Sequence, residues 1–327
     1  MKIDLIVPCY KAHEKLPRLL GTIISQTIVQ DLTVTLVNDA DEKGYEEIVN
    51  TFSKYVDIKE VKLEQNGGPA VARQYGYDKT SNPLVMFIDA DDTLAGAFAL
   101  HILRKQMLAE KENVICIGSF LEENGEHYIN HEADTVWMFG KLYKRQFLDK
   151  YKIRFNETRA NEDNGFNMVC KLMCNDNEKI KFIKDIIYYW HSNPNSITRI
   201  NDCEYSYNQS FVGYTDNMIW ALKEAEDRNP FNGNILYQKL VIMMNLYEYY
   251  IETIGRDERF IEQNWNCCKK YYLEIYKDVK DKIPEDVFKQ VYNEVIRNSY
   301  LGNKLNGIIP KLGIYEFLEK LESEVSQ

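Results

Sequence analysis

The sequence has fewer positive than negative charges and lacks any long hydrophobic run. Its 327 residues include 40 Lys and Arg against 50 Asp and Glu, giving a formal net charge of −10. Nucleic acids and anionic membranes bind to basic surfaces, so this balance argues against general affinity for either. The longest strongly apolar stretches, residues 84–88 and 183–190, are much shorter than the roughly 18 residues typical of a membrane span. No transmembrane segment is therefore expected.

Cysteine is scarce, and the number and spacing of the cysteines do not suggest disulfide pairs. The seven cysteines are an odd number spread along the chain, which suits a reducing compartment better than a disulfide framework. Neither Cys170 with Cys174 nor Cys267 with Cys268 has a second pair at ligand spacing, so buried thiols are expected rather than a zinc site. The first residues lead directly into a strand-like run instead of a signal peptide. We expect a cytoplasmic protein, either free or peripheral at the inner face of the membrane.

Short apolar runs alternate with helical periodicity in the first two hundred residues. Strands are predicted at 3–7, 32–37, 56–63, 84–88, 114–118 and 182–190. This alternation is typical of an α/β domain with a mostly parallel central sheet and helices on both faces. Beyond residue 200 the periodicity becomes helical, in segments 211–227, 235–253, 260–277 and 284–299. We therefore expect one domain over 1–200 and an all-helical C-terminal appendage over 201–327.

Carboxylates are concentrated where two predicted strands end. Asp89, Asp91 and Asp92 follow the run 84–88, and Asp39 follows the run 32–37. Parallel strands present their carboxyl ends at one edge of the sheet, where ligands bind. Crowded carboxylates repel one another unless they share a hard cation with oxygen ligands. The pattern favours a divalent metal site over the alternative, a solvated acidic turn in which Asp92 caps a helix.

Four motifs, in this order, resemble those of the family 2 glycosyltransferases of the GT-A fold, and the resemblance spans nearly all of residues 1–200. They are Ile-Val-Pro-Cys-Tyr at 6–10, Val-Asn-Asp-Ala-Asp at 37–41, Asp-Ala-Asp-Asp at 89–92 and Glu-Asp at 162–163. Asn-Gly-Gly-Pro-Ala at 66–70, followed by Ala72-Arg73, also matches. The sequence departs from the family at Asn38, where Asp is usual, at Ala40-Asp41 in place of Gly-Ser, and at 9–11. These departures affect base recognition rather than the reaction class.

The resemblance implies a Rossmann-like GT-A domain of the bacterial polysaccharide type. The implied activity is inverting transfer of a hexose or N-acetylhexosamine from a UDP-sugar to an acceptor hydroxyl. Asp39 would accept a hydrogen bond from uracil, and Pro8 to Tyr10 would line the nucleoside. The implied donor-binding residues are Pro8, Tyr10, Asp39, Arg73, Asp89 and Ala90. Arg73 would lie near the phosphates; its alternative role is that of a surface ion-pair partner.

The resemblance also implies a metal ion and a general base. Asp91 would bind Mn²⁺ or Mg²⁺ at the two phosphates, where a Lewis acid stabilises the departing diphosphate. His191 would be a metal or phosphate contact, with simple packing as the alternative, and Ser196 and Arg199 on the same loop are lesser candidates. Asp163 would deprotonate the acceptor hydroxyl. The alternative for Glu162 and Asp163 is that they stabilise the start of a helix.

The sequence implies less about the acceptor than about the donor. Trp137, in the segment 137–144, would stack on a sugar ring or pack in the core. The helical appendage would bind an acceptor or form a homo-oligomer, and the acceptor itself would be a carbohydrate, a lipid-linked molecule or a protein. One rival function is a non-catalytic sugar-nucleotide or glycan-binding protein of the same fold. A nucleotidyltransferase is disfavoured because the first strand is not followed by a Gly-rich basic loop.

Overall fold

The chain divides into two compact units, Met1–Arg199 and Ile200–Gln327. The structure, a computed structural model, describes residues 1–193, 203–230, 232–253, 258–297 and 312–326. Ser196 and Arg199 lie outside these residues. Among the helices described, none has both the length and the hydrophobicity needed to cross a membrane.

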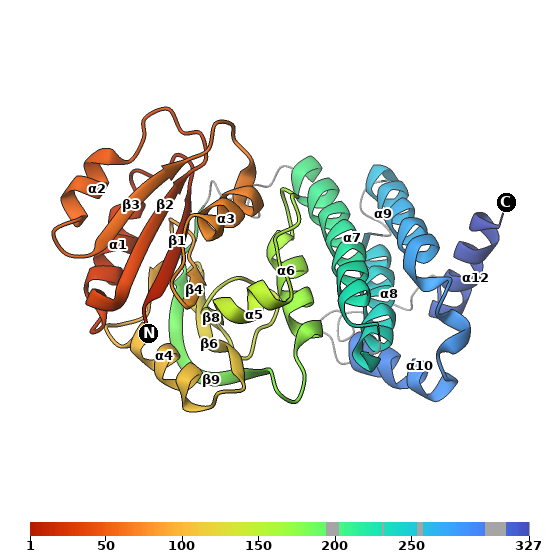
Figure 1. Cartoon of the computed structure of the whole chain (residues 1–327). Coiled ribbons are helices and arrows are strands. Elements are labelled where there is room, and N and C mark those ends of the chain that lie inside the picture. The colour runs from red at the N-terminus through yellow and green to blue at the C-terminus, as the bar shows by residue number, and fades with distance from the viewer. Residues whose placement is uncertain (194–202, 231, 254–257, 298–311, 327) are drawn as a thin grey trace. The chain divides into compact units, whose positions relative to one another are not determined.

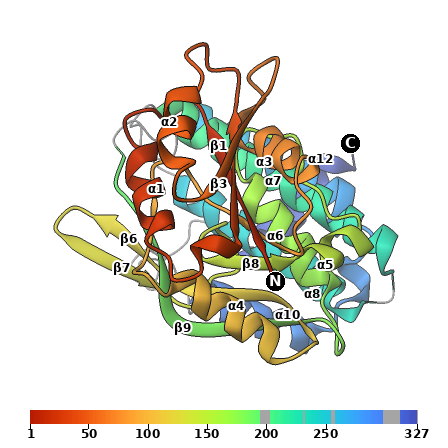
Figure 2. The same ribbon diagram turned by 60° about the vertical axis from the view of Figure 1, so that its left-hand side comes forward.

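The N-terminal unit is built on a sheet that has nine strands within the described residues (Figure 1). They are β1 (Ile3–Cys9), β2 (Leu32–Asn38), β3 (Asp57–Lys62), β4 (Leu84–Phe87), β5 (Thr93–Leu94), β6 (Asn113–Asn124), β7 (His127–His131), β8 (Lys141–Lys144) and β9 (Lys179–Trp190). The order is β3-β2-β1-β4-β8-β6-β9-β5, and β7 pairs with β6 as the projecting hairpin of Figure 2. Strands β1 to β4 are parallel, while β8 is antiparallel to both neighbours. The expected α/β fold is confirmed, with a parallel half and a mixed half.

Helices cover both faces of this sheet, as the sequence predicts. They are α1 (Leu16–Ile24), α2 (Glu46–Phe52), α3 (Gly68–Asp78), α4 (Ala99–Ala109), α5 (Arg145–Lys150) and α6 (Glu162–Met173), with a 3₁₀ turn at Val29–Asp31. Alternate β1 residues, including Leu5 and Val7, share one buried cluster with residues of α1 and α4. Ile6 points to the other face, where a Cβ added to Gly76 of α3 would lie 2.5 Å from its Cγ2 atom. The period of two along β1 therefore places α1 and α4 opposite α3.

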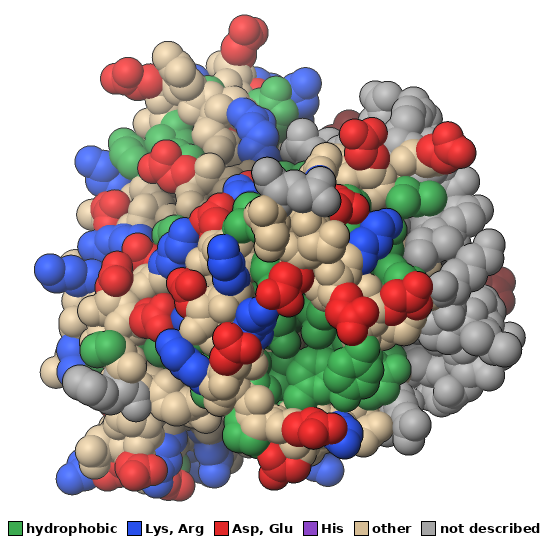
Figure 3. Space-filling model, turned by 90° about the vertical axis from the view of Figure 1, so that its right-hand side faces the viewer, with side chains coloured by type: hydrophobic (Ala, Val, Ile, Leu, Met, Phe, Trp, Pro, Cys, Tyr) green, Lys and Arg blue, Asp and Glu red, His purple; other side chains and the backbone are tan. Residues whose placement is uncertain are grey.

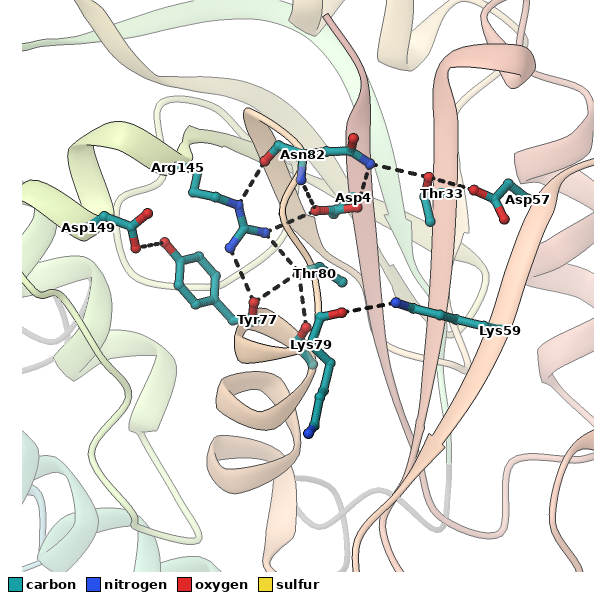
Figure 4. A network of polar contacts seen from close by, with 11 residues as sticks. Asp4, Thr33, Asp57, Lys59, Tyr77, Lys79, Thr80, Asn82, Arg145 and Asp149 are labelled. Atoms are coloured by element: carbon teal, nitrogen blue, oxygen red, sulfur yellow. Dashed lines mark hydrogen bonds and ion pairs between the residues drawn. The ribbon is translucent and has the colours of Figure 1, made fainter.

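A buried polar network closes the amino-terminal end of the sheet (Figure 4). Asp4 of β1, 1% exposed, accepts hydrogen bonds from the backbone and side chain of Asn82 and from Arg145 Nη2 at 3.0 Å. Arg145 also donates to the carbonyls of Asn82 and Tyr77. Because the network joins β1 to the helix after β8, it fixes the sheet at the edge away from the carboxyl ends of β1, β2 and β4.

The C-terminal unit is helical in its described residues. It contains α7 (Cys203–Arg228), α8 (Gly233–Thr253), α9 (Glu258–Tyr271), α10 (Glu285–Tyr292) and α12 (Ile314–Val325), with π-helical turns at Tyr272–Tyr276 and Asn293–Arg297 and a 3₁₀ turn at Lys280–Lys282. Tyr247, Tyr250, Trp265 and Phe317 pack as one aromatic cluster in its core. Of the ten tyrosines of this unit whose burial the structure describes, six are buried. On the face drawn in Figure 3, acidic and basic side chains are interspersed, and one larger patch of hydrophobic side chains lies among scattered ones.

Candidate active site

Asp39 lies directly after β2, at the carboxyl edge of the sheet, and is 4% exposed. Its Oδ1 accepts a hydrogen bond from the Gly67 amide at 2.7 Å, and its Oδ2 accepts one from the Gly68 amide at 2.9 Å. Gly68 has a positive φ of 81°, which favours glycine. Asp39 thus holds the first turn of α3 against the sheet, and its carboxylate is stabilised by the amino end of that helix.

The loop after β1 is held by Asp41, one of the departures from the family motif, and by His13 and Tyr45, which no signal in the sequence marked. Asp41 Oδ2 accepts hydrogen bonds from the Lys11 amide at 2.8 Å and from the Tyr45 hydroxyl at 3.1 Å. The ring of His13 stacks on Tyr45 with centroids 4.3 Å apart. Pro8 is partly buried, whereas Tyr10 is 51% exposed on this loop. The two segments predicted to contact the nucleoside therefore lie together.

Arg73 joins two of the predicted motifs. It is 4% exposed, and its guanidinium donates to Asp89 at 2.7 Å and to Glu162 at 2.5 Å. Burial alone lowers the pKa of Arg73, but these two carboxylates outweigh it and raise the pKa, so the guanidinium stays charged. Its Nε atom is buried and has no hydrogen-bond partner among the described residues. With its terminal nitrogens so engaged, Arg73 links the end of β4 to the start of α6.

Asp163 lies in the first turn of α6, beside this arginine link. Burial, followed by the charge of Glu162, raises the pKa of Asp163 to about 7, although Arg73 lowers it. Its Oδ1 accepts a hydrogen bond from the Asn164 amide at 2.8 Å. A carboxyl group whose pKa lies near the working pH is suited to take a proton. Glu162 is less suited to this role, because its Oε1 accepts a hydrogen bond from Arg73.

The last two carboxylates of the Asp-Ala-Asp-Asp motif, those of Asp91 and Asp92, lie in different environments. Asp92 is 1% exposed and accepts hydrogen bonds from the Tyr188 hydroxyl at 2.7 Å and the His191 amide at 2.9 Å. Burial, reinforced by Asp89 and Asp91, raises the pKa of Asp92 well above its usual value. Asp92 therefore holds the end of β9, and no helix begins at Thr93, where β5 starts. Ala90, between these acids, is 8% exposed.

Asp91, by contrast, remains accessible, with its side chain 32% exposed. Its Oδ2 accepts a hydrogen bond from Asn193 Nδ2 at 2.7 Å and lies 3.9 Å from Lys15 Nζ. Arg18 donates to the Asp91 carbonyl at 2.5 Å. These two cations at the start of α1 bring positive charge to the motif, and no signal in the sequence marked them. Only the packing of α1 beside β5 reveals their position.

His191 lies next to this motif, with both ring nitrogens within hydrogen-bonding distance of a partner. Nε2 is 2.8 Å from the Thr93 hydroxyl, and Nδ1 is 3.1 Å from Glu123 Oε2. A carboxylate on one nitrogen is a common arrangement for a metal-binding histidine, because it fixes the tautomer and ring orientation. His191 would have to exchange its Thr93 contact to bind a metal through Nε2.

A nucleotide-bound divalent metal fits these residues better than a metal held by protein alone. Within the part of the chain that the structure describes, no three His, Cys, Asp or Glu side chains are grouped to hold a metal ion. Mg²⁺ commonly binds one or two carboxylates and completes its shell with water and substrate phosphates. The accessible oxygens of Asp91 match such a site. Asp39 follows β2, Asp91 follows β4, and Asp163 lies in the first turn of α6. Arg73 bridges the end of β4 and the start of α6.

Comparison with known proteins identifies a family for the N-terminal unit. Residues 4–160 match the model of "Glycosyl transferase family 2". Glycosyltransferase GlyA of Streptococcus pneumoniae is 25% identical over 227 residues, covering 61% of this chain but only 32% of GlyA. The chain therefore spans about a third of that relative's length.

Two further matches cover most of this chain. Poly(ribitol-phosphate) beta-N-acetylglucosaminyltransferase TarP of Staphylococcus aureus is 24% identical, and the match covers 92% of this chain and 96% of TarP. The crystal structure of residues 1–349 of S. aureus TarS with UDP-GlcNAc superposes with a TM-score of 0.70 at 17% identity, covering 92% of this chain and 93% of that fragment. The structural match confirms the GT-A fold.

Proposed function

Because residues 4–160 belong to glycosyl transferase family 2, we propose that this chain is a metal-dependent glycosyltransferase that inverts the anomeric carbon. It transfers a hexose or N-acetylhexosamine from a UDP-sugar to an acceptor hydroxyl. The observation that carries this proposal is the placement of Asp163, with a pKa near 7, beside an arginine that also binds the Asp-Ala-Asp-Asp motif. The names of TarP and of the TarS complex with UDP-GlcNAc support N-acetylglucosamine as a donor sugar to test first.

The donor end of the site is assigned to the edge formed by β1 and β2. Asp39 keeps acceptor lone pairs beyond the two amides that it binds, since a carboxylate offers about four. It is therefore able to accept the N–H of uracil. Tyr10, half exposed on the neighbouring loop, offers its ring to the base. Lys15 and Arg18 supply positive charge where the diphosphate would meet Asp91.

Asp91, with His191 as a second contact, would hold Mn²⁺ or Mg²⁺. When bound, such an ion supplies Lewis-acid stabilisation of the leaving diphosphate. The chain's own residues set where the nucleotide lies: Asp92 fixes the end of β9 and so places His191, through its amide, beside the motif. Arg73 meanwhile fixes the side chain of Asp89, just after β4.

Asp163 acts as the general base in this proposal. Its carboxylate removes the proton of the acceptor hydroxyl as that oxygen attacks the anomeric carbon, and the bond from that carbon to the diphosphate oxygen breaks. Attack from the face opposite the leaving group inverts the configuration. Glu162 does not compete for the proton, because its Oε1 is held by Arg73.

The proposal is tested by UDP release from UDP-GlcNAc, UDP-Glc and UDP-Gal, with and without Mn²⁺ and after treatment with EDTA. Metal-dependent release that falls at least about a hundredfold in Asp163→Asn, with UDP affinity retained, is the expected result. Glu64→Gln, at an exposed position, is the matched control. Saturable UDP-sugar binding without any release would instead support the non-catalytic binding protein.

The two units receive separate assignments. The N-terminal unit would carry donor binding and chemistry. The helical unit would bind a carbohydrate, lipid-linked or protein acceptor or mediate homo-oligomerisation, and light scattering of the full chain tests the latter. Location at the inner face of the membrane would be tested by fractionation of cells that express the chain.

A further inference from the structure

The turn before β8 is held from within by an aspartate and a lysine. Asp134 Oδ1 accepts hydrogen bonds from the amides of Val136 and Trp137 at 2.8 and 2.9 Å. Lys141 of β8 is 1% exposed; its Nζ donates to the Trp137 carbonyl and lies 3.6 Å from Asp134 Oδ1. Both the amide and the carbonyl of Trp137 are therefore fixed by side chains of this short segment.

Helix α6, which carries Asp163, holds the same turn. Asn167 Nδ2 donates to the carbonyls of Val136 and Trp137 at 2.8 and 3.2 Å, and its Oδ1 accepts a hydrogen bond from the Tyr143 hydroxyl at 2.7 Å. Asn167 is one helical turn after Asp163, so the two side chains lie on the same side of the helix. The position of Trp137 is thereby fixed relative to the proposed base.

Burying the ammonium group of a lysine to hold a turn costs desolvation free energy. Burial lowers the pKa of Lys141 to about 8, although Asp134 and Asp163 both oppose the shift. Replacing buried ion pairs with apolar side chains of similar volume is often neutral or stabilising. Lys141 therefore contributes geometry more than stability, and the geometry that it fixes is that of Trp137.

Trp137 forms an aromatic group with the end of β9. Its ring centroid lies 5.0 Å from that of Trp190 and 6.0 Å from that of Phe139. Phe139 in turn stacks on Tyr188, with centroids 5.0 Å apart. Phe139 and Tyr188 are buried, whereas both tryptophans are only partly buried at the edge of the core. The tryptophans thus rest on a buried aromatic base and are partly exposed.

We propose that Trp137 and Trp190 form an aromatic platform that binds a pyranose ring of the acceptor, and that Lys141 and Asn167 are positioning residues for this platform. The inference rests on the proposed function. It adds the acceptor class, a glycan with a pyranose ring at or next to the accepting hydroxyl. A pyranose presents an axial C–H face to which the apolar face of an indole is complementary, while the rim of hydroxyls stays hydrated.

An acyclic polyol phosphate lacks that flat C–H face. Its phosphates would need accessible cations, and the one cation that contacts this turn, Lys141, is already committed to a backbone carbonyl in the described part of the chain. Trp190 also directly precedes His191, whose amide binds Asp92. The platform is therefore connected to Asp92 through His191 and to the helix of Asp163 through Asn167.

The platform is tested by tryptophan fluorescence of the full chain, titrated with methyl β-D-glucopyranoside, methyl N-acetyl-β-D-glucosaminide and, as an acyclic comparison, ribitol 5-phosphate. Saturable quenching by at least one pyranoside, weaker with ribitol 5-phosphate, is expected. Trp137→Ala and Trp190→Ala should each raise the dissociation constant about tenfold, in line with the usual strength of an aromatic contact. Trp220→Phe, in the helical unit, is the matched control.

The positioning role requires a separate measurement. Lys141→Met should raise the pyranoside dissociation constant at least about threefold while leaving UDP affinity unchanged. If Lys141→Met folds poorly, Asn167→Ala should show the same effect. Pyranoside binding that survives both tryptophan variants, or that is equalled by ribitol 5-phosphate, would overturn the platform. These titrations need no turnover, so a chain that binds pyranosides but releases no UDP would refute the proposed function and leave the platform standing.

Discussion

Asp163→Asn is expected to stabilise the protein while it removes transfer. In the wild type the pKa of Asp163 rises from its ordinary value of 3.8 to about 7 on folding. Between those values the folded state holds a proton that the unfolded state has released, so the stability that this proton provides is lost as the pH rises through 7. Above pH 7 the wild type carries an ionised, partly buried carboxylate that the asparagine variant lacks.

The magnitude follows from the size of the shift. A shift of about three pKa units corresponds to roughly 4 kcal/mol at most, and because Asp163 is partly exposed, solvent screening reduces this to about 1–2 kcal/mol. Urea unfolding at pH 8 should show the variant more stable by that amount, and the difference should shrink by pH 5. The exposed Glu64→Gln control should show neither change.

The same ionisation governs the rate. If Asp163 is the base, kcat/KM of the wild type should fall about tenfold per pH unit below pH 7, since only the ionised carboxylate accepts the proton. A variant no more stable than the wild type at pH 8, or equally stabilised at both pH values, would refute the raised pKa. A rate that is flat between pH 5.5 and 7 would refute the role as base.

Arg73→Met should raise the pKa of Asp163 further, because Arg73 lowers it. The acidic limb of the kcat/KM profile should therefore move to higher pH. Arg104 is also ion-paired, and Arg104→Met should leave the profile unchanged. Arg145→Met should cost about 3 kcal/mol of unfolding free energy by leaving the buried Asp4 without its charge partner, with activity per folded molecule unchanged. Gly76→Ala should cost about 2 kcal/mol in urea unfolding, since its Cβ would overlap Ile6 and force α3 from the sheet.

The sequence was sufficient for the parts of the site that local pattern controls. The runs at 3–7, 32–37 and 84–88 became parallel neighbours, so Asp39 and Asp89 necessarily followed strand ends at one edge. Pro69 is favoured in the first turn of a helix, and α3 begins at Gly68. Because strands and helices alternate along the chain, this arrangement follows with little dependence on contacts between residues distant in sequence.

The sequence was insufficient where distant side chains meet. Arg73 was assigned to the phosphates or to a surface ion pair, yet it is buried between Asp89 and Glu162, the latter 89 positions away. Short elements such as β5 and β8 were also missed, because two to four residues carry too little periodicity to be recognised. Lys141 gave no signal, since a lysine in a strand is ordinarily solvated.

The departures from the family motif can be understood from the same contacts. Asn38, which stands where the family has Asp, donates to Glu60 Oε1 at 2.7 Å and accepts a hydrogen bond from the Asp41 amide at 2.6 Å. Asp41, which replaces Ser, in turn binds the Lys11 amide and the Tyr45 hydroxyl. An aspartate at position 38 would repel Glu60, so the amide at 38 and the acid at 60 depend on each other. The loop beside the predicted uracil contact is therefore held by different but mutually satisfied groups, and Asp39 links the end of β2 to the first turn of α3.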